Sequence, residues 1–391
     1  MSSKSPLSRV QPNLLRKLNE RLVIDALQRN GPCSRADLTR QMGISPPTAS
    51  KTVASLMSVG LIEEVESQHV SLGRPGKLLR FSSKQMQVVG VVMDARRCWI
   101  GFSSFEGNIS PEHSLSFPTP GTYAALIDAL EDGVKQLLQQ CDSIIGIGIS
   151  VPGLTNSFEQ KTVFSPNLHM TDGQSPGQDL SERLGVQCIV LQEMHALALG
   201  ERAFGAAQGL NDFAIIDITT GVGLGVFSGG RLIEGHRGMA GELGHLTVDL
   251  KGKLCGCGNH GCIETVACDA AFLDHVSENF GEQLDWGSLT DAIRSGRLQP
   301  TAEIKQYAEY LSIALSAVIN IYNPSHLFVH GQIFDFIDDF CEQVRQLTRN
   351  RTLGPPFEAC ELVPARGNKE LGAIAGMIEY YMDTLAPVLD K

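Results

Sequence analysis

The stretch from Gly238 to Glu264 reads GMAGELGHLTVDLKGKLCGCGNHGCIE and gathers histidine, cysteine and carboxylate side chains in one short run. Four of its residues follow the spacing H-x9-C-x-C-x4-C, namely His245, Cys255, Cys257 and Cys262. In structural sites Zn²⁺ prefers four nitrogen and sulfur ligands in tetrahedral geometry. Glycines between the cysteines let the backbone turn tightly enough for neighbouring thiolates to face one ion. The spacing therefore predicts a zinc site, with His260 as a competing imidazole that spacing alone does not exclude.

A site with four protein ligands leaves no coordination position for a reacting water, so we expect the ion to be structural. Its expected role is to hold Glu242, His245 and Glu264 in fixed relation. Carboxylates accept hydrogen bonds from hydroxyl groups, so this arrangement suits a polyhydroxylated ligand. The alternative is that both carboxylates are solvated loop side chains.

The run ELGH at 242–245, followed by CGCGNHGCIE at 255–264, resembles the signature of the ROK family. That family joins sugar kinases with sugar-responsive transcriptional repressors. The resemblance covers nearly the whole chain. It implies a two-lobed α/β body with the actin-like, ribonuclease-H-like ATPase fold of sugar kinases, with sugar held in the cleft between the lobes. It leaves open whether this chain is a kinase or a repressor.

Composition indicates a globular protein of two or three domains, with 391 residues of which 42% are hydrophobic and 19% are charged. No apolar run is long enough to span a membrane, and the N-terminal sequence MSSKSPLSRV has no hydrophobic signal core. The tight cysteine cluster favours metal binding in a reducing compartment over a disulfide framework. We therefore expect a cytoplasmic protein with no membrane insertion.

The net charge of −11 is unevenly distributed, because residues 1–84 carry +7 and the remainder carries −18. A basic segment on an acidic body indicates that one end binds a polyanion. Apolar residues at helical spacing predict a first helix over 14–29, which Asn30-Gly31-Pro32 ends. A capping-box-like pattern from Ser34 to Asp37 opens a second helix that runs to Gly43, and Ser45-Pro46 opens a third.

Three short helices, the last with small polar residues at its start, are the helix-turn-helix arrangement in which the third helix enters the major groove. Two strands at 61–66 and 78–82 then flank a cationic wing tip, SLGRPGK, that fits a minor groove. This segment resembles the winged domain of ROK repressors, which ROK kinases lack. A solvated hairpin on a protein-interaction domain is the alternative. The predicted DNA contacts are Ser45, Pro47, Thr48, Ser50, Lys51, Arg74 and Lys77.

Alternating strands and helices from Val88 onward, with strand–turn–strand hairpins, predict the two-lobed α/β body. We therefore divide the chain into a winged helix-turn-helix DNA-binding domain at 1–84 and a kinase-like sensor body at 85–391, whose zinc loop is 242–264. Residues 83–87 are the expected linker. By the resemblance, nucleotide would contact the glycine hairpins where it is used.

Phosphoryl transfer depends on positioning and charge stabilisation, so the loss of a motif that positions the phosphates, the metal ion or the base strongly reduces the rate. ROK kinases begin this body with G-x-D-x-G-G-T, whereas this chain has Val92 at the aspartate position and has lost the glycines. The second phosphate hairpin, Thr219–Gly225, keeps most of its glycines, and we interpret it as a tight turn that packs two strands. The family's Asn-Asp pair, whose aspartate is the base, is here Gln192-Glu193. We therefore expect no efficient kinase activity and no catalytic residue.

The motifs that hold the ligand in the family are retained. The resemblance implies that the sugar is contacted by Asn167, Glu193, Glu242, His245 and Glu264, with Gln192 as a weaker candidate. His245 serves twice in this interpretation, because one ring nitrogen can bind zinc while the other binds a ligand hydroxyl.

These patterns predict a DNA-binding repressor of carbohydrate uptake or catabolism genes that senses a sugar or sugar phosphate as a homo-oligomer, either dimer or tetramer. One alternative is an active sugar kinase with an appended DNA-binding domain. Another is a regulator controlled by a protein partner, such as a sugar transporter component. The sequence does not discriminate this last possibility from the first.

Overall fold

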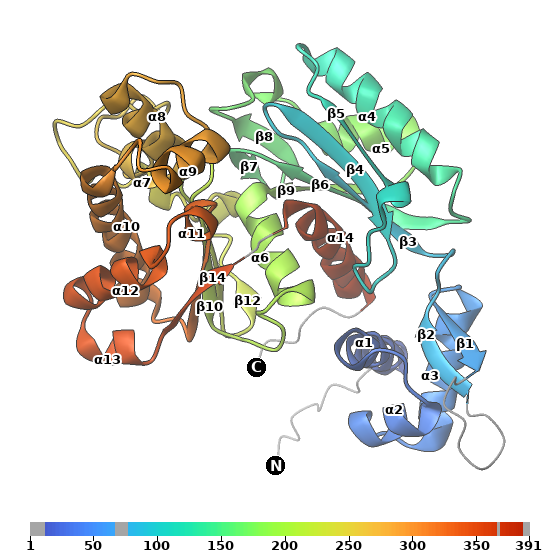
Figure 1. Cartoon of the computed structure of the whole chain (residues 1–391). Helices are drawn as coiled ribbons and strands as arrows, with labels where there is room; N and C mark the ends of the chain where they lie inside the picture. The colour runs from blue at the N-terminus through green and yellow to red at the C-terminus, as the bar shows by residue number, and fades with distance from the viewer. Residues whose placement is uncertain (1–11, 67–76, 366–367, 386–391) are drawn as a thin grey trace, which may run out of the picture. The chain divides into compact units, whose positions relative to one another are not determined.

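The computed structural model describes residues 12–66, 77–365 and 368–385, which form two compact units (Figure 1). Unit 1 comprises Met1–Ser150, Pro176–Ile189 and Ala373–Lys391. Unit 2 comprises Val151–Ser175 and Val190–Gly372. Among the described residues, no helix has both the length and the apolar character needed to cross a membrane.

Unit 1 begins with three helices, α1 (Pro12–Asn30), α2 (Arg35–Met42) and α3 (Pro46–Ser58). The predicted caps are confirmed. Ser34 and Asp37 form a capping box at α2, Gly43 ends that helix in the left-handed conformation, and Ser45 caps α3. An N-cap oxygen accepts a hydrogen bond from a backbone N–H that the first turn leaves without a partner.

The strands β1 (Ile62–Glu66) and β2 (Lys77–Phe81) pair antiparallel, as the sequence predicts for a winged domain. The base of this hairpin is fixed by the pairing of Ile62 with Phe81, both of which are buried. The tip that we interpret as the wing, including Arg74, lies outside the described residues.

After the winged segment, unit 1 is built on a five-stranded sheet with the strand order β5-β4-β3-β6-β9. Its strands are β3 (Gln87–Val92), β4 (Arg97–Ser103), β5 (Ser114–Pro118), β6 (Ile144–Val151) and β9 (Cys188–Gln192). The predicted hairpin from Val88 is β3–β4, and β6 pairs parallel with β3. Of the residues 83–87 that we expect as a linker, buried Gln87 belongs to β3.

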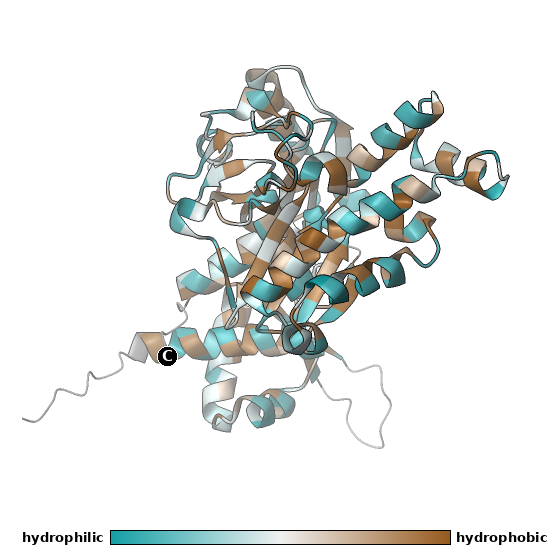
Figure 2. Ribbon diagram, turned by 90° about the vertical axis from the view of Figure 1, so that its left-hand side faces the viewer, coloured by the Kyte–Doolittle hydropathy of each residue, from teal (hydrophilic) through white to brown (hydrophobic). Residues whose placement is uncertain are grey.

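Two helices, α4 (Tyr123–Leu138) and α5 (Pro176–Leu184), lie side by side on this sheet (Figure 1). The buried side chains of α4 recur at helical spacing, and such helices show alternating hydrophilic and hydrophobic bands (Figure 2). The C-terminal helix α14 (Lys369–Leu385) contacts the sheet at β6, where the Ala373 carbonyl lies against Gly148.

Unit 2 is built on a second five-stranded sheet with the order β12-β11-β10-β13-β14. Its strands are β10 (Phe213–Asp217), β11 (Gly223–Ser228), β12 (Arg231–Leu232), β13 (His326–His330) and β14 (Glu361–Ala365). As in unit 1, the first two strands along the chain form an antiparallel hairpin, and the first of them also has a parallel partner. A separate small hairpin joins β7 (Leu154–Asn156) to β8 (Lys161–Phe164).

One face of this sheet carries the main core of unit 2, formed by Ile216, Leu224 and Val329 with side chains of the surrounding helices. These helices are α7 (Glu264–Ala267), α8 (Asp269–Phe280), α9 (Trp286–Arg294), α10 (Thr301–Tyr322), α11 (Ile333–Phe336), α12 (Phe340–Arg351) and α13 (Gly354–Glu358). The hairpin β10–β11 also contacts α6 (Glu193–Phe204), whose Met194 and Ala198 lie against Gly223 and Gly225. Helix α6 thereby presents Glu193, its first residue, beside the turn of the hairpin.

Candidate functional site

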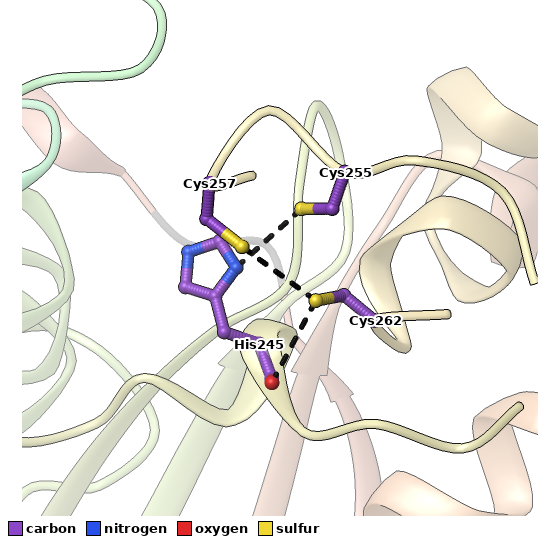
Figure 3. A group of neighbouring side chains, drawn as sticks. All are labelled: His245, Cys255, Cys257 and Cys262. Carbon is purple, nitrogen blue, oxygen red and sulfur yellow. Dashed lines mark hydrogen bonds between the residues drawn. The ribbon is translucent and has the colours of Figure 1, made fainter. Parts of the chain in front are cut away.

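The four residues of the predicted metal site converge in the structure (Figure 3). One ligand atom from each of His245, Cys255, Cys257 and Cys262 lies within 4.8 Å of the others. Cys255 Sγ is 3.7 Å from His245 Nδ1, and Cys257 Sγ is 3.7 Å from Cys262 Sγ. His260 lies outside this group, because its exposed ring faces the carbonyl of Gly252.

The loop adopts this shape because its backbone crosses itself closely. Gly261 has a φ of +69°, and a Cβ atom at that position would lie 1.5 Å from the carbonyl oxygen of Asp249. Only glycine tolerates both the left-handed conformation and this approach. Gly261 thereby places Cys262 opposite Cys255 and Cys257, as the glycine interleaving of the sequence predicts.

The donor set fits a divalent metal ion with a preference for sulfur. Cys255 and Cys262 are buried, and three thiols with one imidazole match the ligand number and type of a structural zinc site. Burial also raises the pKa of the Cys255 thiol, whose Sγ donates a hydrogen bond to Glu264 Oε1 at 2.9 Å. A bound cation would favour the thiolate over the thiol. The group could therefore hold a metal ion, and the chemistry of its donors favours zinc.

The two ring nitrogens of His245 face different groups. Nδ1 is directed to the cysteines and lies 3.6 Å from Glu264 Oε1, whereas Nε2 lies 3.6 Å from Glu242 Oε2. A metal at the cysteine group would take Nδ1 and fix the ring orientation, leaving Nε2 beside the Glu242 carboxylate. The geometry is thus compatible with the double role that the sequence assigns to His245.

Glu242 is joined to helix α6 through Gln192. Gln192 Nε2 donates a 2.7 Å hydrogen bond to Glu242 Oε1. The pKa of Glu242 is raised, mainly because the carboxyl group is buried and secondarily because Glu264 and Glu193 lie nearby. The proximity of His245 and the hydrogen bond from Gln192 oppose this increase. The second amide atom of Gln192, Oε1, is buried and has no hydrogen-bond partner among the described residues. A buried acceptor of this kind is costly unless a donor reaches it, and a ligand hydroxyl is such a donor.

Glu193 lies in a second charged group, which sequence reasoning missed. Its Oε2 is 2.9 Å from Lys369 Nζ, which is also 3.4 Å from Asp217 Oδ2. Asp217 Oδ1 is 3.2 Å from His330 Nδ1 and accepts the hydroxyl hydrogen of Thr219. Although burial alone would raise the pKa of Asp217, the hydrogen bond from His330 and the charge of Lys369 lower it to about 2. The Asp217 carboxyl group is therefore ionised at neutral pH.

Asn167 is the one predicted sugar contact that these interactions do not include. It is exposed in the turn after β8. The preceding residue, Pro166, lies close to the cysteine loop, because a Cβ atom added to Gly256 would be 3.9 Å from Pro166 Cβ. The turn thus lies next to the cysteine loop. The hydrogen bonds of the described residues do not join Asn167 to the carboxylates.

The predicted DNA contacts fall mainly on the exposed side of α3. Ser45, Pro47, Ser50 and Lys51 are exposed and Thr48 is half-buried, whereas Ala49, Val53 and Leu56 are buried as expected. Lys77 is exposed, but its Nζ is 2.8 Å from Glu64 Oε2. Arg74 is outside the described residues.

The first kinase motif is replaced in structure as well as in sequence. Val92 is buried at the end of β3, paired with Trp99 and Ser150. In the turn that follows, Asp94 Oδ1 accepts a hydrogen bond from the Arg96 backbone N–H. This carboxylate caps its own turn, which is consistent with the interpretation that it does not substitute for the metal-associated acid.

A winged helix-turn-helix segment and a body of two five-stranded sheets with the same strand order define a DNA-binding protein with a sugar-kinase-like fold. Residues 89–382 match the model of the ROK family, and residues 17–70 match the model of the MarR family. The chain therefore belongs to the ROK family and carries an N-terminal MarR-type winged helix-turn-helix domain.

Individual relatives agree with this assignment. The chain is 29% identical to the xylose repressor of Bacillus spizizenii over 94% of this chain and 97% of that protein. It is similar to the crystal structure of a ROK family transcriptional regulator, described as a homologue of the Escherichia coli MLC protein. The TM-score is 0.80 and the identity 26%, over 95% of this chain and 98% of that one. It also resembles the ROK hexokinase of Thermus thermophilus, with a TM-score of 0.66, 26% identity, and 76% and 100% coverage.

Proposed function

We propose that this protein is a cytoplasmic transcriptional repressor of carbohydrate uptake or catabolism genes that releases DNA when it binds a sugar or sugar phosphate. Its relatives support the repressor class, because they include a xylose repressor that matches along nearly the whole chain. The winged helix-turn-helix segment at 1–84 would bind the operator, and the body at 85–391 would bind the effector. The protein would act as a homodimer or tetramer, with half-sites roughly 34–36 Å apart.

The buried Gln192 Oε1 beside Glu242 is the observation that carries the sugar site. Glu242 and Glu264 present carboxylate acceptors, each 3.6 Å from one ring nitrogen of His245, and the unpaired amide oxygen adds another acceptor. With Nδ1 bound to a metal ion, His245 Nε2–H is a donor. A sugar supplies several hydroxyl donors at fixed spacing, which matches a cluster of acceptors. Glu193 and Asn167 complete the proposed set of contacts.

The proposed metal is a structural zinc ion held by His245, Cys255, Cys257 and Cys262. When bound, it would supply charge and rigid geometry to the loop 242–264. The protein residues then carry the recognition: Glu242 and Glu264 accept from the ligand, and His245 Nε2 lies beside them. Four protein ligands leave no position for a reacting water.

Two features support a sensor that does not phosphorylate its sugar. Glu193 stands at the position of the catalytic base in ROK kinases, but Lys369 Nζ neutralises it at 2.9 Å. Val92 stands where those kinases have an aspartate. A general base needs a free acceptor oxygen aligned with the hydroxyl proton, and Lys369 occupies one oxygen of the Glu193 carboxylate.

Fluorescence anisotropy of labelled DNA from the upstream region of the gene tests the proposal. The protein should bind tightly, with an affinity that falls as salt rises. One member of a panel of sugars and sugar phosphates should weaken this binding at least tenfold. Tight binding that no sugar changes would contradict the effector and favour a protein signal. No binding by the zinc-loaded protein would contradict the repressor itself.

A further inference from the structure

Helix α14 has charged contacts at both of its ends, and the two ends belong to different units. Its first four residues belong to unit 2, and the helix continues in unit 1 from Ala373. Lys369 is the first residue of the helix, and its ammonium group forms ion pairs with Glu193 and Asp217 of unit 2. Near the other end, Glu379 and Asp383 form ion pairs with Arg21 of α1, which belongs to the DNA-binding segment. One continuous helix therefore connects the proposed sugar site with the winged domain.

The first turn of α14 packs directly on α6, the helix that begins with Glu193. A Cβ atom on Gly372 would lie 2.3 Å from the Ala196 carbonyl oxygen, and a Cβ on Gly200 would lie 2.9 Å from the Gly372 nitrogen. The two helix backbones are thus in contact, with no side chain between them that could absorb a displacement. A displacement of Glu193 would therefore move Lys369 both through the ion pair and through this backbone contact.

The opposite end of α14 binds α1 through polar groups. Arg21 Nη1 is 2.8 Å from Asp383 Oδ1, and Arg21 Nη2 is 3.4 Å from Glu379 Oε1. Lys17 Nζ donates to the Thr384 carbonyl oxygen at 2.9 Å. The Arg21 side chain retains only 17% of its exposure, so its two ion pairs are less screened than those of a fully exposed arginine.

An aromatic cluster supports the same contact. Phe105, in the loop after β4, is fully buried between Phe81 of β2 and Tyr381 of α14. Its ring centroid is 5.3 Å from that of Phe81 and 5.9 Å from that of Tyr381. Gln28 of α1 adds a hydrogen bond to the Phe105 carbonyl oxygen at 3.2 Å. The winged domain is therefore packed on α14 through a buried core as well as through charges.

We propose that Lys369 senses the ligand at Glu193 and that α14 transmits the change to the DNA-binding segment through Arg21. This inference rests on the proposed function. A sugar hydroxyl that donates to Glu193 competes with Lys369 for the same carboxylate. The ammonium group of Lys369 then shifts toward Asp217, the first turn of α14 moves with it, and the position of α1 changes at Arg21.

The experiment measures the coupling factor, which is the ratio of DNA dissociation constants with and without the effector sugar. Anisotropy gives this ratio, and calorimetry gives the sugar affinity of the same zinc-loaded, full-length samples. Lys369→Met interrupts the proposed path at the sugar end, and Arg21→Gln interrupts it at the DNA-binding end. Arg183→Gln is the matched control, because Arg183 also bridges two carboxylates, those of Asp128 and Glu131, but contacts neither α1 nor α14 through them.

We expect the wild type and Arg183→Gln to show the same coupling factor, at least tenfold. Arg21→Gln should bind sugar like the wild type, while its coupling factor falls to within about twofold of unity. Lys369→Met should lose coupling to the same extent, whatever its sugar affinity. Variants that bind sugar and release DNA by the wild-type factor would overturn the inference and leave the proposed function intact. A wild type that binds sugar without any change in DNA affinity would contradict both.

Discussion

The two five-stranded sheets have the same strand order, yet their first hairpins end differently. Strand β3 ends at Val92, paired with Trp99 and Ser150, and β10 ends at Asp217, paired with Gly223 and His330. The turn after β3 carries Asp94, which caps its own backbone, and the turn after β10 keeps its glycines beside an ionised carboxylate. The same scaffold therefore carries a hydrophobic strand end in unit 1 and a charged one in unit 2.

This difference separates the positions that packing fixes in the two hairpins from those that it leaves free. Gly223 and Gly225 of the second hairpin are required for packing, because α6 lies directly on them. The hairpin of unit 1 has no equivalent constraint at its exposed turn, where Ala95 and Arg96 lie in solvent. The acids that we propose as sugar contacts and the loop of the candidate metal site likewise lie in unit 2.

The largest effect is expected from the cysteine loop, which supports the second hairpin through Gly241 and Gly244. Cys262→Ser should abolish stoichiometric zinc binding and lower the unfolding free energy by on the order of 5 kcal/mol, because the metal ion is bound only in the folded state. Metal analysis and denaturant unfolding measure the two quantities. His260→Ala is the control and should retain the metal, and zinc loss in that variant would show that the imidazole ligand has been misassigned.

A side chain in the second hairpin should be the next most damaging change. A Cβ at Gly225 would lie 2.8 Å from both Ala198 Cβ and the Met194 carbonyl oxygen. Gly225→Val should therefore cost about 3 kcal/mol, a size typical of overpacking in a core. Ala95→Val in the exposed first turn is the comparison and should change stability by less than about 0.5 kcal/mol. Equal costs in urea unfolding would remove the contrast between the hairpins.

Helix α6, which packs on the second hairpin, makes stability depend on pH through His195. Burial lowers the pKa of His195 to about 4 from an ordinary value near 6.5. Between these values the unfolded chain binds a proton that the folded protein does not, so stability is lost as the pH falls from 6.5 to 4. The loss is at most about 3 kcal/mol.

Unfolding free energies measured across this pH range test the assignment. His195→Gln should flatten that part of the profile relative to the wild type. If the variant's unfolding free energy depends on pH as steeply as that of the wild type, groups other than His195 cause the pH dependence.

The smallest change is expected in nucleotide turnover. With Mg-ATP and any sugar of the panel, phosphate transfer should stay at the background rate, because Lys369 neutralises Glu193 and Val92 replaces the acid of the first hairpin. A coupled assay with a ROK kinase as positive control measures it. Sugar-dependent turnover well above background would restore the kinase alternative.

Sequence reasoning predicted the local features well, because they depend on neighbours in the chain. The caps at Ser34 and Ser45, the two hairpins and the preference for His245 over His260 all follow from short patterns and agree with the structure. Lys369 was not predicted. It lies 176 residues from Glu193, so only tertiary folding brings the two together. Asp217 had a weak signal, as an acid at the end of a buried strand before a glycine-rich turn.

Reciprocal linkage tests the central claim most directly. If a sugar weakens DNA binding, DNA must weaken sugar binding by the same factor. Calorimetry of the effector sugar with the free protein and with the protein saturated by its upstream DNA measures that factor. We predict at least a tenfold weaker sugar affinity on DNA, equal to the factor from anisotropy. An identical sugar affinity in the two states would contradict the account of a sugar-responsive repressor.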